Sequence, residues 1–283
     1  MPNGIALTIG INSVDPAHYG GWTGDLNACE ADAEDMTAIA AERKFRVTTL
    51  KTSSATRQQV QKEITAAAKA LKSGDMFLLT YSGHGGQLPD LNSDEPDATD
   101  ETWCLYDGEL VDDELYALLG KCAKAVRILV FSDSCHSGTV VKFAYYHGTT
   151  MTREGENNSN GVRYRNMPRD VAMRTYRANR EFYDPILRDE KLKKAAGNVK
   201  ASVLLISGCQ DNQLSLDGDF NGLFTANMLR VWKDGAFNTG RAKRSYKDFH
   251  KAIVNRMPPT QTPNYFFIGA ENKAFEAQAP FTL

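Results

Sequence analysis

Apolar segments typical of buried strands alternate with segments of helical periodicity along most of the chain. The predicted strands span residues 4–12, 45–51, 75–82, 126–133, 202–208 and 265–268. The predicted helices span residues 25–43, a stretch that begins at Thr56 and ends before Gly74, 221–233 and 245–256. Helices between strands carry the chain back, so that successive strands can lie parallel. We therefore predict an α/β fold whose mostly parallel central sheet has six or more strands and helices on both faces.

Length and composition exclude several classes of protein. The 283 residues can bury a full core, and a net charge of −2 gives no global reason to expect a nucleic-acid or membrane partner. No apolar run approaches the ~20 residues of a membrane helix, and the first residues do not resemble a secretory signal. Five cysteines without C-x-x-C spacing argue against a disulfide framework or a zinc site. We expect a protein of the reducing cytoplasm.

Two of the predicted strands end in short turns that carry reactive side chains. His84 follows the strand 75–82 within a run of serine and glycine, and Cys135 follows the strand 126–133 within a similar run. The carboxyl ends of parallel strands meet at one edge of a sheet, where open α/β folds place their ligands. We therefore expect the imidazole and the thiol to lie close together in one cleft.

A cysteine and a histidine that meet in this way can form a catalytic dyad. The imidazole lowers the pKa of the thiol, the thiolate attacks a carbonyl carbon, and the imidazole passes the proton to the leaving amine. Backbone N–H groups near Gly85 and Cys135 could stabilise the oxyanion. His136 is a rival base, but it adjoins Cys135, and adjacent side chains usually point apart. The alternative for Cys135 alone is an inert core thiol, and for His84 an ordinary loop histidine.

Further short motifs accompany this pair along the chain. They are DLNACEADA at 25–33, YSGHGGQ at 81–87, LVDDEL at 110–115, DSCHSG at 133–138, ISGCQDNQLSLDG at 206–218 and QTPNYFFIG at 261–269. Together they resemble the caspase-like cysteine peptidases of family C14, specifically the metacaspase and bacterial orthocaspase branch. The separation of 51 residues between His84 and Cys135 is also close to the ~50 of caspases. The resemblance covers nearly the whole chain and implies a caspase-like fold.

The resemblance implies roles for individual residues. Cys135 would be the nucleophile and His84 the general acid and base. The pocket for the substrate residue before the cut, the S1 pocket, would be lined by Asp32, Asp133, Ser82 and Cys29. Two carboxylates among small residues favour a guanidinium or an ammonium and repel a carboxylate, so the implied cut follows arginine or lysine, with arginine preferred for its bidentate fork. Without the resemblance, Asp32 fits a solvated helix residue and Asp133 a cap at the strand end.

Many metacaspases need calcium, which four aspartates bind. Asp100, Asp112 and Asp113 match three of these positions, but Lys142 stands at the fourth. A lysine ammonium opposes a cation that takes six to eight oxygen ligands. The sequence therefore predicts an enzyme that needs neither calcium nor another cofactor. It also predicts a solvated loop for residues 87–114, which contain eleven acids and no lysine or arginine.

Residues 142–200 are polar, and seven arginines lie between positions 153 and 180. A connection of this length is uncommon inside a compact domain, so we predict an exposed or functional insertion. The resemblance implies a large subdomain over residues 1–144, a linker over residues 145–200 that the enzyme cuts itself, and a small subdomain over residues 201–283 that completes the sheet. The alternative for the arginines is a solvated loop that binds nothing, and the lack of interleaved aromatic residues disfavours nucleic acid.

Taken together, these expectations predict a cysteine endopeptidase that hydrolyses peptide bonds after arginine or lysine through a covalent thioester. Its partners would be protein or peptide substrates, and we expect a monomer that binds neither nucleic acid nor a membrane. One alternative is a catalytically silent caspase-like module that binds partners, although this chain keeps both members of the dyad. Another is a different hydrolase or acyltransferase on a doubly wound sheet, whose serine form is disfavoured because the chain has no G-x-S-x-G elbow.

Overall fold

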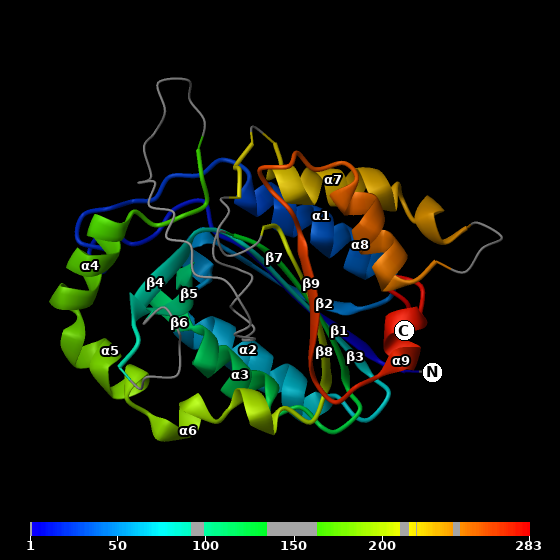
Figure 1. Cartoon of the computed structure of the whole chain (residues 1–283), viewed down its shortest axis with the longest axis horizontal. Coiled ribbons are helices and arrows are strands. Elements are labelled where there is room, and N and C mark those ends of the chain that lie inside the picture. Colours follow the sequence, from blue (N-terminus) through cyan, green and yellow to red (C-terminus); the bar gives the residue numbers. More distant parts are fainter. Residues whose placement is uncertain (1, 92–98, 135–162, 210–214, 219, 240–243) are drawn as a thin grey trace.

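A computed structural model describes residues 2–91, 99–134, 163–209, 215–218, 220–239 and 244–283. A six-stranded sheet with the order β2-β1-β3-β7-β8-β9 forms its centre (Figure 1). The strands are β1 Gly4–Gly10, β2 Arg46–Lys51, β3 Met76–Ser82, β7 Arg127–Asp133, β8 Ser202–Ser207 and β9 Asn264–Gly269. All neighbours pair in parallel except β8 and β9, which are antiparallel. The mostly parallel sheet predicted from the sequence is confirmed.

Alternate residues of each strand point to opposite sides of the sheet, and both sides carry apolar side chains. Helices therefore cover both faces. The helices of the described residues are α1 Cys29–Glu42, α2 Arg57–Ala70, α3 Asp112–Leu119, α4 Arg169–Ala178, α5 Arg180–Leu187, α6 Glu190–Lys193, α7 Leu223–Trp232, α8 Tyr246–Val254 and α9 Lys273–Ala277. Leu79 and Val130 belong to a core with side chains of α2 and α3. Leu78 and Leu129 belong to a second core with side chains of α1, α7, α8 and α9.

Local hydrogen bonds explain where two of these helices begin. Thr56, where this helix was predicted to begin, caps α2, because its side chain accepts the Gln59 N–H (3.2 Å). Helix α1 begins four residues later than the predicted residue 25. The side-chain oxygen of Asn12, beyond the end of β1, accepts the N–H groups of Cys29 (2.9 Å) and Glu30 (3.2 Å). Residues before Cys29 therefore stay outside the helix.

The solvated loop predicted for residues 87–114 is wrong for residues 87–91 and 99–114, while residues 92–98 lie outside the described residues. This stretch contributes to a three-stranded antiparallel sheet of β4 Gly85–Pro89, β5 Thr99–Leu105 and β6 Gly108–Val111. The prediction followed the acid count and overlooked Trp103, which stacks on Tyr81 with ring centroids 4.5 Å apart. The aspartates Asp100, Asp112 and Asp113 are at most 3% exposed.

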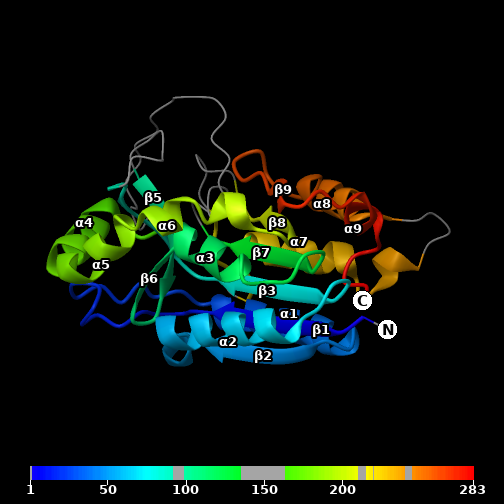
Figure 2. The ribbon, with the colours of Figure 1, turned by 90° about the horizontal axis from the view of Figure 1, so that it is seen from below.

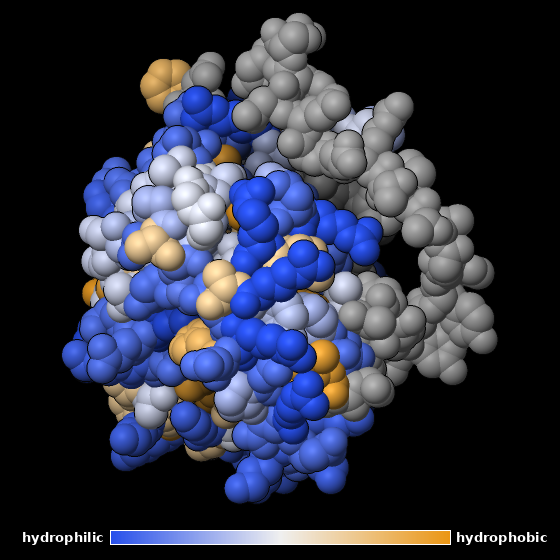
Figure 3. All heavy atoms as spheres, turned by 90° about the vertical axis from the view of Figure 1, so that its left-hand side faces the viewer, coloured by the Kyte–Doolittle hydropathy of each residue, from blue (hydrophilic) through white to orange (hydrophobic). Residues whose placement is uncertain are grey.

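Residues 142–200 were predicted to be an exposed or functional insertion; the part that the structure describes, residues 163–200, is not simply exposed, while residues 142–162 lie outside the described residues and a functional role stays a prediction. Helices α4, α5 and α6 form a lobe at the end of the sheet opposite the two termini (Figure 2). Tyr176, Tyr183 and Leu187 pack there against Leu88 and Val111, which the polar composition of the segment concealed. The outer face over α4 and α5 is mostly hydrophilic, with scattered hydrophobic side chains (Figure 3). Within the described parts of the chain, no helix combines the length and apolarity that crossing a bilayer requires.

Candidate active site

The carboxyl edge of the sheet brings Ser82 and Asp133 together. They are the last residues of β3 and β7 and are partners in the register of these two parallel strands. Each lies an even number of residues after Leu78 or Leu129, so both side chains point to the face that α1 and α7 cover. The sheet therefore directs a hydroxyl and a carboxylate towards the first turns of two helices.

Asp32 lies in the first turn of α1, and its side chain contacts Ser82. Its Oδ2 accepts the Ser82 hydroxyl (2.7 Å), and its Oδ1 accepts the Asn221 side-chain amide (3.0 Å) and the Gly222 N–H (3.1 Å). The residue is 1% exposed. The predicted alternative of a solvated helix residue is therefore wrong for Asp32.

Asp133 is bound to the first turn of α7. Its Oδ2 accepts the backbone N–H (3.1 Å) and the hydroxyl (2.8 Å) of Thr225, and its Oδ1 accepts the Ser215 hydroxyl (2.6 Å). The first N–H groups of a helix have no partner within it and carry partial positive charge, so they stabilise a carboxylate here. These bonds also fix the position of both oxygens.

A third carboxylate, Asp217, completes the group and was not recognised from the sequence. Its Oδ2 accepts the Asn27 N–H (2.8 Å), and its side chain is 1% exposed. Asp217 belongs to the motif at residues 206–218, which was used only as evidence of resemblance. The acidic residue of this motif was the signal that could have identified it.

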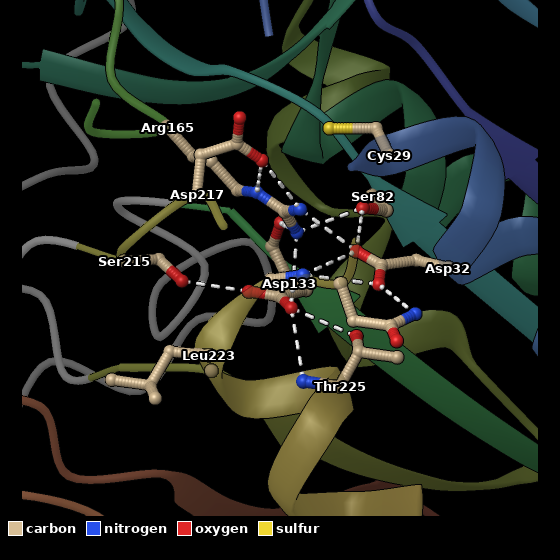
Figure 4. Close-up of polar contacts among 12 residues, drawn as sticks. Cys29, Asp32, Ser82, Asp133, Arg165, Ser215, Asp217, Leu223 and Thr225 are labelled. Atoms are coloured by element: carbon tan, nitrogen blue, oxygen red, sulfur yellow. Dashed lines mark hydrogen bonds and ion pairs between the residues drawn. The ribbon is translucent and has the colours of Figure 1, made fainter. Parts of the chain in front are cut away.

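The guanidinium of Arg165 fills the space between these three carboxylates (Figure 4). Its Nη2 lies 2.7 Å from Asp32 Oδ2 and 3.0 Å from Asp217 Oδ1, and its Nη1 lies 3.0 Å from Asp133 Oδ2. Nε also donates to Asp217 Oδ1 (3.3 Å), and Nη1 donates to Ser82 Oγ (2.8 Å). The Arg165 side chain is 0% exposed. We call Asp32, Asp133, Asp217 and Ser82 the acidic pocket.

Burial and charge act against each other in this pocket. Burial raises the pKa of Asp32, and the Arg165 guanidinium opposes that rise. Burial alone would lower the pKa of Arg165, but the carboxylates, Asp133 foremost, hold it above its ordinary value. Three carboxylates face one guanidinium, so the electrostatic potential of the pocket strongly favours a bound cation.

Cys29 lies beside this pocket (Figure 4). Its thiol is buried, and burial raises its pKa well above the ordinary value. A thiol in this state is a poor nucleophile. The role of Cys29 as a wall residue of the S1 pocket stays a prediction.

His84 lies beyond the end of β3, with its ring against Trp22 at a centroid distance of 4.7 Å. Its Nε2 is 2.9 Å from the carbonyl oxygen of Gly24. A carbonyl only accepts, so Nε2 carries the proton and the neutral ring keeps its lone pair on Nδ1. Nδ1 is buried and has no hydrogen-bond partner among the described residues. Burial lowers the pKa of His84 to about 4, although Gly24 opposes the shift.

The other predicted site residues divide into two groups. The backbone N–H of Gly85 donates to the carbonyl oxygen of Arg165 (3.0 Å). This amide therefore contacts the same residue whose side chain occupies the acidic pocket. Cys135 and its neighbour His136 lie outside the described residues. An open cavity of about 310 Å³ adjoins His84 and is bounded on one side by residues 163–168.

The predicted calcium ligands lie away from the acidic pocket, on the small sheet and at the start of α3. Asp112 Oδ1 accepts the Asp113 N–H (2.9 Å), and Asp100 is on β5. Among the described residues, no group of three histidine, cysteine or acidic side chains is arranged to hold a metal ion. Lys142 lies outside these residues, so calcium independence stays a prediction.

A parallel sheet covered on both faces, with a histidine and a cation pocket at its carboxyl edge, defines a caspase-like α/β protein. The caspase domain of the Peptidase_C14 family matches residues 3–275. The chain therefore belongs to the Peptidase_C14 caspase-domain family and is metacaspase-like within it.

Curated relatives and solved structures agree with this assignment. Metacaspase-1 of Coccidioides immitis is 30% identical over 245 residues, which are 78% of this chain and 52% of the relative. Metacaspase-1A of Aspergillus oryzae is 29% identical over 250 residues, which are 79% of this chain and 58% of the relative. The chain thus spans little more than half the length of these two relatives.

Two solved structures share the fold. Protein GSU0716 from Geobacter sulfurreducens is 63% identical with a TM-score of 0.85, and the match covers 100% of this chain and 99% of that one. Caspase-1 from Spodoptera frugiperda has a TM-score of 0.55 at 11% identity, with 95% and 86% covered. The second similarity extends to the fold alone.

Proposed function

We propose that this chain is a cysteine endopeptidase that hydrolyses peptide bonds after arginine, and less readily after lysine. Cys135 would be its nucleophile and His84 its general acid and base. One observation carries the proposal: a guanidinium is fully buried among the three carboxylates of the acidic pocket, at the sheet edge where His84 lies. A substrate arginine would make the same contacts in place of Arg165.

The tautomer of His84 suits this chemistry. The lone pair on Nδ1 can take the proton of the Cys135 thiol, and the thiolate then attacks the carbonyl carbon of the substrate arginine. The Gly85 N–H stabilises the oxyanion as it develops. His84 next gives the proton to the leaving amine, and a water molecule hydrolyses the thioester.

The walls of the pocket support selectivity for a cation. A substrate aspartate would place a fourth carboxylate beside three that are already buried, which costs several kcal/mol. Gly222 gives the guanidinium its room, because a Cβ atom there would lie 2.5 Å from Arg165 Nη1. We also propose that the enzyme does not need calcium, on the ground that Lys142 replaces an acidic ligand.

Short peptides that differ only in the residue before the cut test this function. We expect hydrolysis after arginine, slower hydrolysis after lysine, none after aspartate, and no effect of a calcium chelator. Cys135→Ala should abolish turnover, and Gly222→Ala should lower kcat/KM for arginine while the nucleophile stays in place. Turnover after aspartate, or full activity of Cys135→Ala, would contradict the proposal.

The second candidate is a catalytically silent caspase-like module. The ion pairs that hold Arg165 in the acidic pocket favour it, because a permanently occupied pocket could admit no substrate. Failure to hydrolyse any peptide in the series would support this candidate.

A further inference from the structure

Trp22 is an aromatic side chain beside His84 that takes no part in the proposed proton transfers. It is half-buried, its ring centroid lies 4.7 Å from that of the imidazole, and it lines the open cavity that adjoins His84. A ring of this size removes a large area from water where it packs. The atoms that the indole covers therefore indicate its role.

The indole lies over the side of the imidazole that carries Nε2. A Cβ atom at Gly24 would lie 2.8 Å from Trp22 Cη2 and 3.1 Å from His84 Cδ2, so both rings converge on the Cα atom of Gly24. Cδ2 is bonded to Nε2 and lies across the ring from Nδ1. Trp22 therefore covers the hydrogen bond between His84 Nε2 and the Gly24 carbonyl (2.9 Å).

Gly24 can bring these groups together because it has no side chain. Its φ of +55° lies in the left-handed region, which residues with a Cβ atom rarely adopt. A side chain would also have to displace one of the two rings. Both requirements are met only by glycine, so indole, imidazole and carbonyl form one tightly packed group.

The loop that carries Trp22 is anchored at the end of β5. The buried Tyr19 hydroxyl donates to the Leu105 carbonyl (2.7 Å), and the Asp15 N–H donates to the Tyr106 carbonyl (2.8 Å). The Tyr19 ring meets Trp22 edge to face, with centroids 6.0 Å apart. These contacts hold the indole in a fixed place.

The same stretch of chain fixes the backbone of His84. The Cys104 N–H (3.0 Å) and the Tyr81 hydroxyl (2.7 Å) both donate to the His84 carbonyl. Cys104 directly precedes the two residues that anchor the loop of Trp22. The end of β5 therefore sets the distance between the histidine and the indole, which a contact made only for packing would not require.

We propose that Trp22 is a positioning residue for His84. Its indole holds the imidazole against the Gly24 carbonyl and shields the hydrogen bond between them from water. The proton then stays on Nε2, and the lone pair stays on Nδ1. Trp22 acts only through His84. The consequence for catalysis rests on the proposed function, because it requires His84 to act as the general base.

Exchange of the Nε2 proton with water tests this role without relying on activity. In protein with isotope-labelled histidine, wild type at neutral pH should give a slowly exchanging proton resonance on His84 Nε2, which His84→Gln identifies by its absence. Trp22→Ala should lose this resonance to fast exchange, whereas Trp22→Phe, which keeps an aromatic face, should retain it. Slow exchange in Trp22→Ala, with its folding verified by urea unfolding, would overturn the inference.

Two further variants separate positioning from a general loss of packing. Tyr19→Phe removes only the hydroxyl that anchors the loop, so exchange should accelerate less than in Trp22→Ala. Phe182→Ala is the matched control, because Phe182 is an exposed aromatic residue whose ring meets His18 (6.0 Å between centroids). Exchange at His84 should stay at the wild-type rate in this control. Equal acceleration in Phe182→Ala and Trp22→Ala would contradict a specific role for Trp22.

Hydrolysis of a short arginine peptide measures the consequence for catalysis. Trp22→Ala should lower kcat about 10–100-fold, the scale of a misplaced catalytic group, and change KM little because the acidic pocket is untouched. The acid limb of kcat/KM should move to higher pH, because water that reaches the imidazole relieves the burial that lowers the pKa of His84 to about 4. The charges of Arg165 and Asp217, which shift this pKa in opposite directions, stay in place.

The two measurements distinguish failure of the inference from failure of the proposed function. An active wild type whose kcat, acid limb and proton exchange are unchanged in Trp22→Ala would overturn the inference alone. A wild type that hydrolyses no arginine peptide, yet loses the protected proton in Trp22→Ala, would overturn the proposed function and support the positioning of the imidazole.

Discussion

Two regions of the molecule bury carboxyl groups, which costs free energy when the groups are charged, and the two regions offset this cost in opposite ways. In the acidic pocket, Arg165 neutralises part of the charge, and hydroxyl and N–H donors bind the remaining carboxylate oxygens. On β6, burial raises the pKa of Glu109 to about 8, although a hydrogen bond from Thr102 and the charge of Arg57 oppose the shift. Glu109 is therefore mostly protonated at neutral pH, whereas the pocket keeps its charge by holding a cation.

This difference separates a structural acid from one that can recognise a ligand. A protonated Glu109 has lost its attraction for cations and serves the packing between β5 and β6. The pocket carboxylates are arranged around a side chain that another arginine could replace.

Glu109 should make the folded protein less stable as the pH rises. Its folded pKa of about 8 lies above the ordinary 4.5, so its contribution is full below pH 4.5 and is lost as the pH rises through 8. The shift corresponds to about 5 kcal/mol. Urea unfolding across this range should show the loss in wild type and a flatter profile in Glu109→Gln. Equal profiles would mean that Glu109 is charged in the fold.

Arg165→Met should destabilise the fold at neutral pH by about 3–5 kcal/mol, because the buried carboxylates lose their cation. The comparison is made in a Cys135→Ala background, so that peptidase activity does not affect it. Arg169→Met, at an exposed position, is the matched control and should stay within about 0.5 kcal/mol of its parent. Urea midpoints that fall equally in both variants would show that Arg165 has no special role.

His84 should act in the opposite pH direction to Glu109. Its folded pKa of about 4 lies below the ordinary 6.5, so its contribution is full above pH 6.5 and is lost as the pH falls towards 4. The shift corresponds to about 3 kcal/mol. Urea unfolding of Cys135→Ala with and without His84→Gln measures the difference. A loss of the same size in both proteins would contradict a buried neutral imidazole.

Asp217→Asn should reduce the preference for arginine over lysine by about tenfold, which is the ~1.4 kcal/mol of one charged hydrogen bond. Asp217 accepts from Arg165 Nε as well as Nη2, and lysine has no group that corresponds to Nε. The ratio of kcat/KM for matched arginine and lysine peptides measures this effect. An unchanged ratio would show that Asp32 and Asp133 alone set the preference.

The sequence predicted the elements of the central sheet, because strands and helices have recognisable residue patterns. Apolar segments typical of buried strands identified the six strands of the central sheet, and the edge positions of Ser82 and Asp133 follow from the ends of two of them. Arg165 and Asp217 come from irregular segments, and their contacts reach across 133 and 52 residues. No local pattern signals the contact of Arg165, whereas the motif at residues 206–218 was the one signal for Asp217. Residues 87–114 were misjudged because their many acids outweighed apolar residues such as Leu88, Trp103 and Leu105, which the structure buries.

The central claim is that the acidic pocket recognises the positive charge of a residue before the cut. The most direct test compares two short peptides, one with arginine and one with citrulline, its neutral analogue of nearly the same shape, as substrates for wild type. We expect the arginine peptide to be hydrolysed at least about 100-fold faster, the equivalent of ~2.7 kcal/mol for charged hydrogen bonds in a buried site. Equal rates for the two peptides would contradict it.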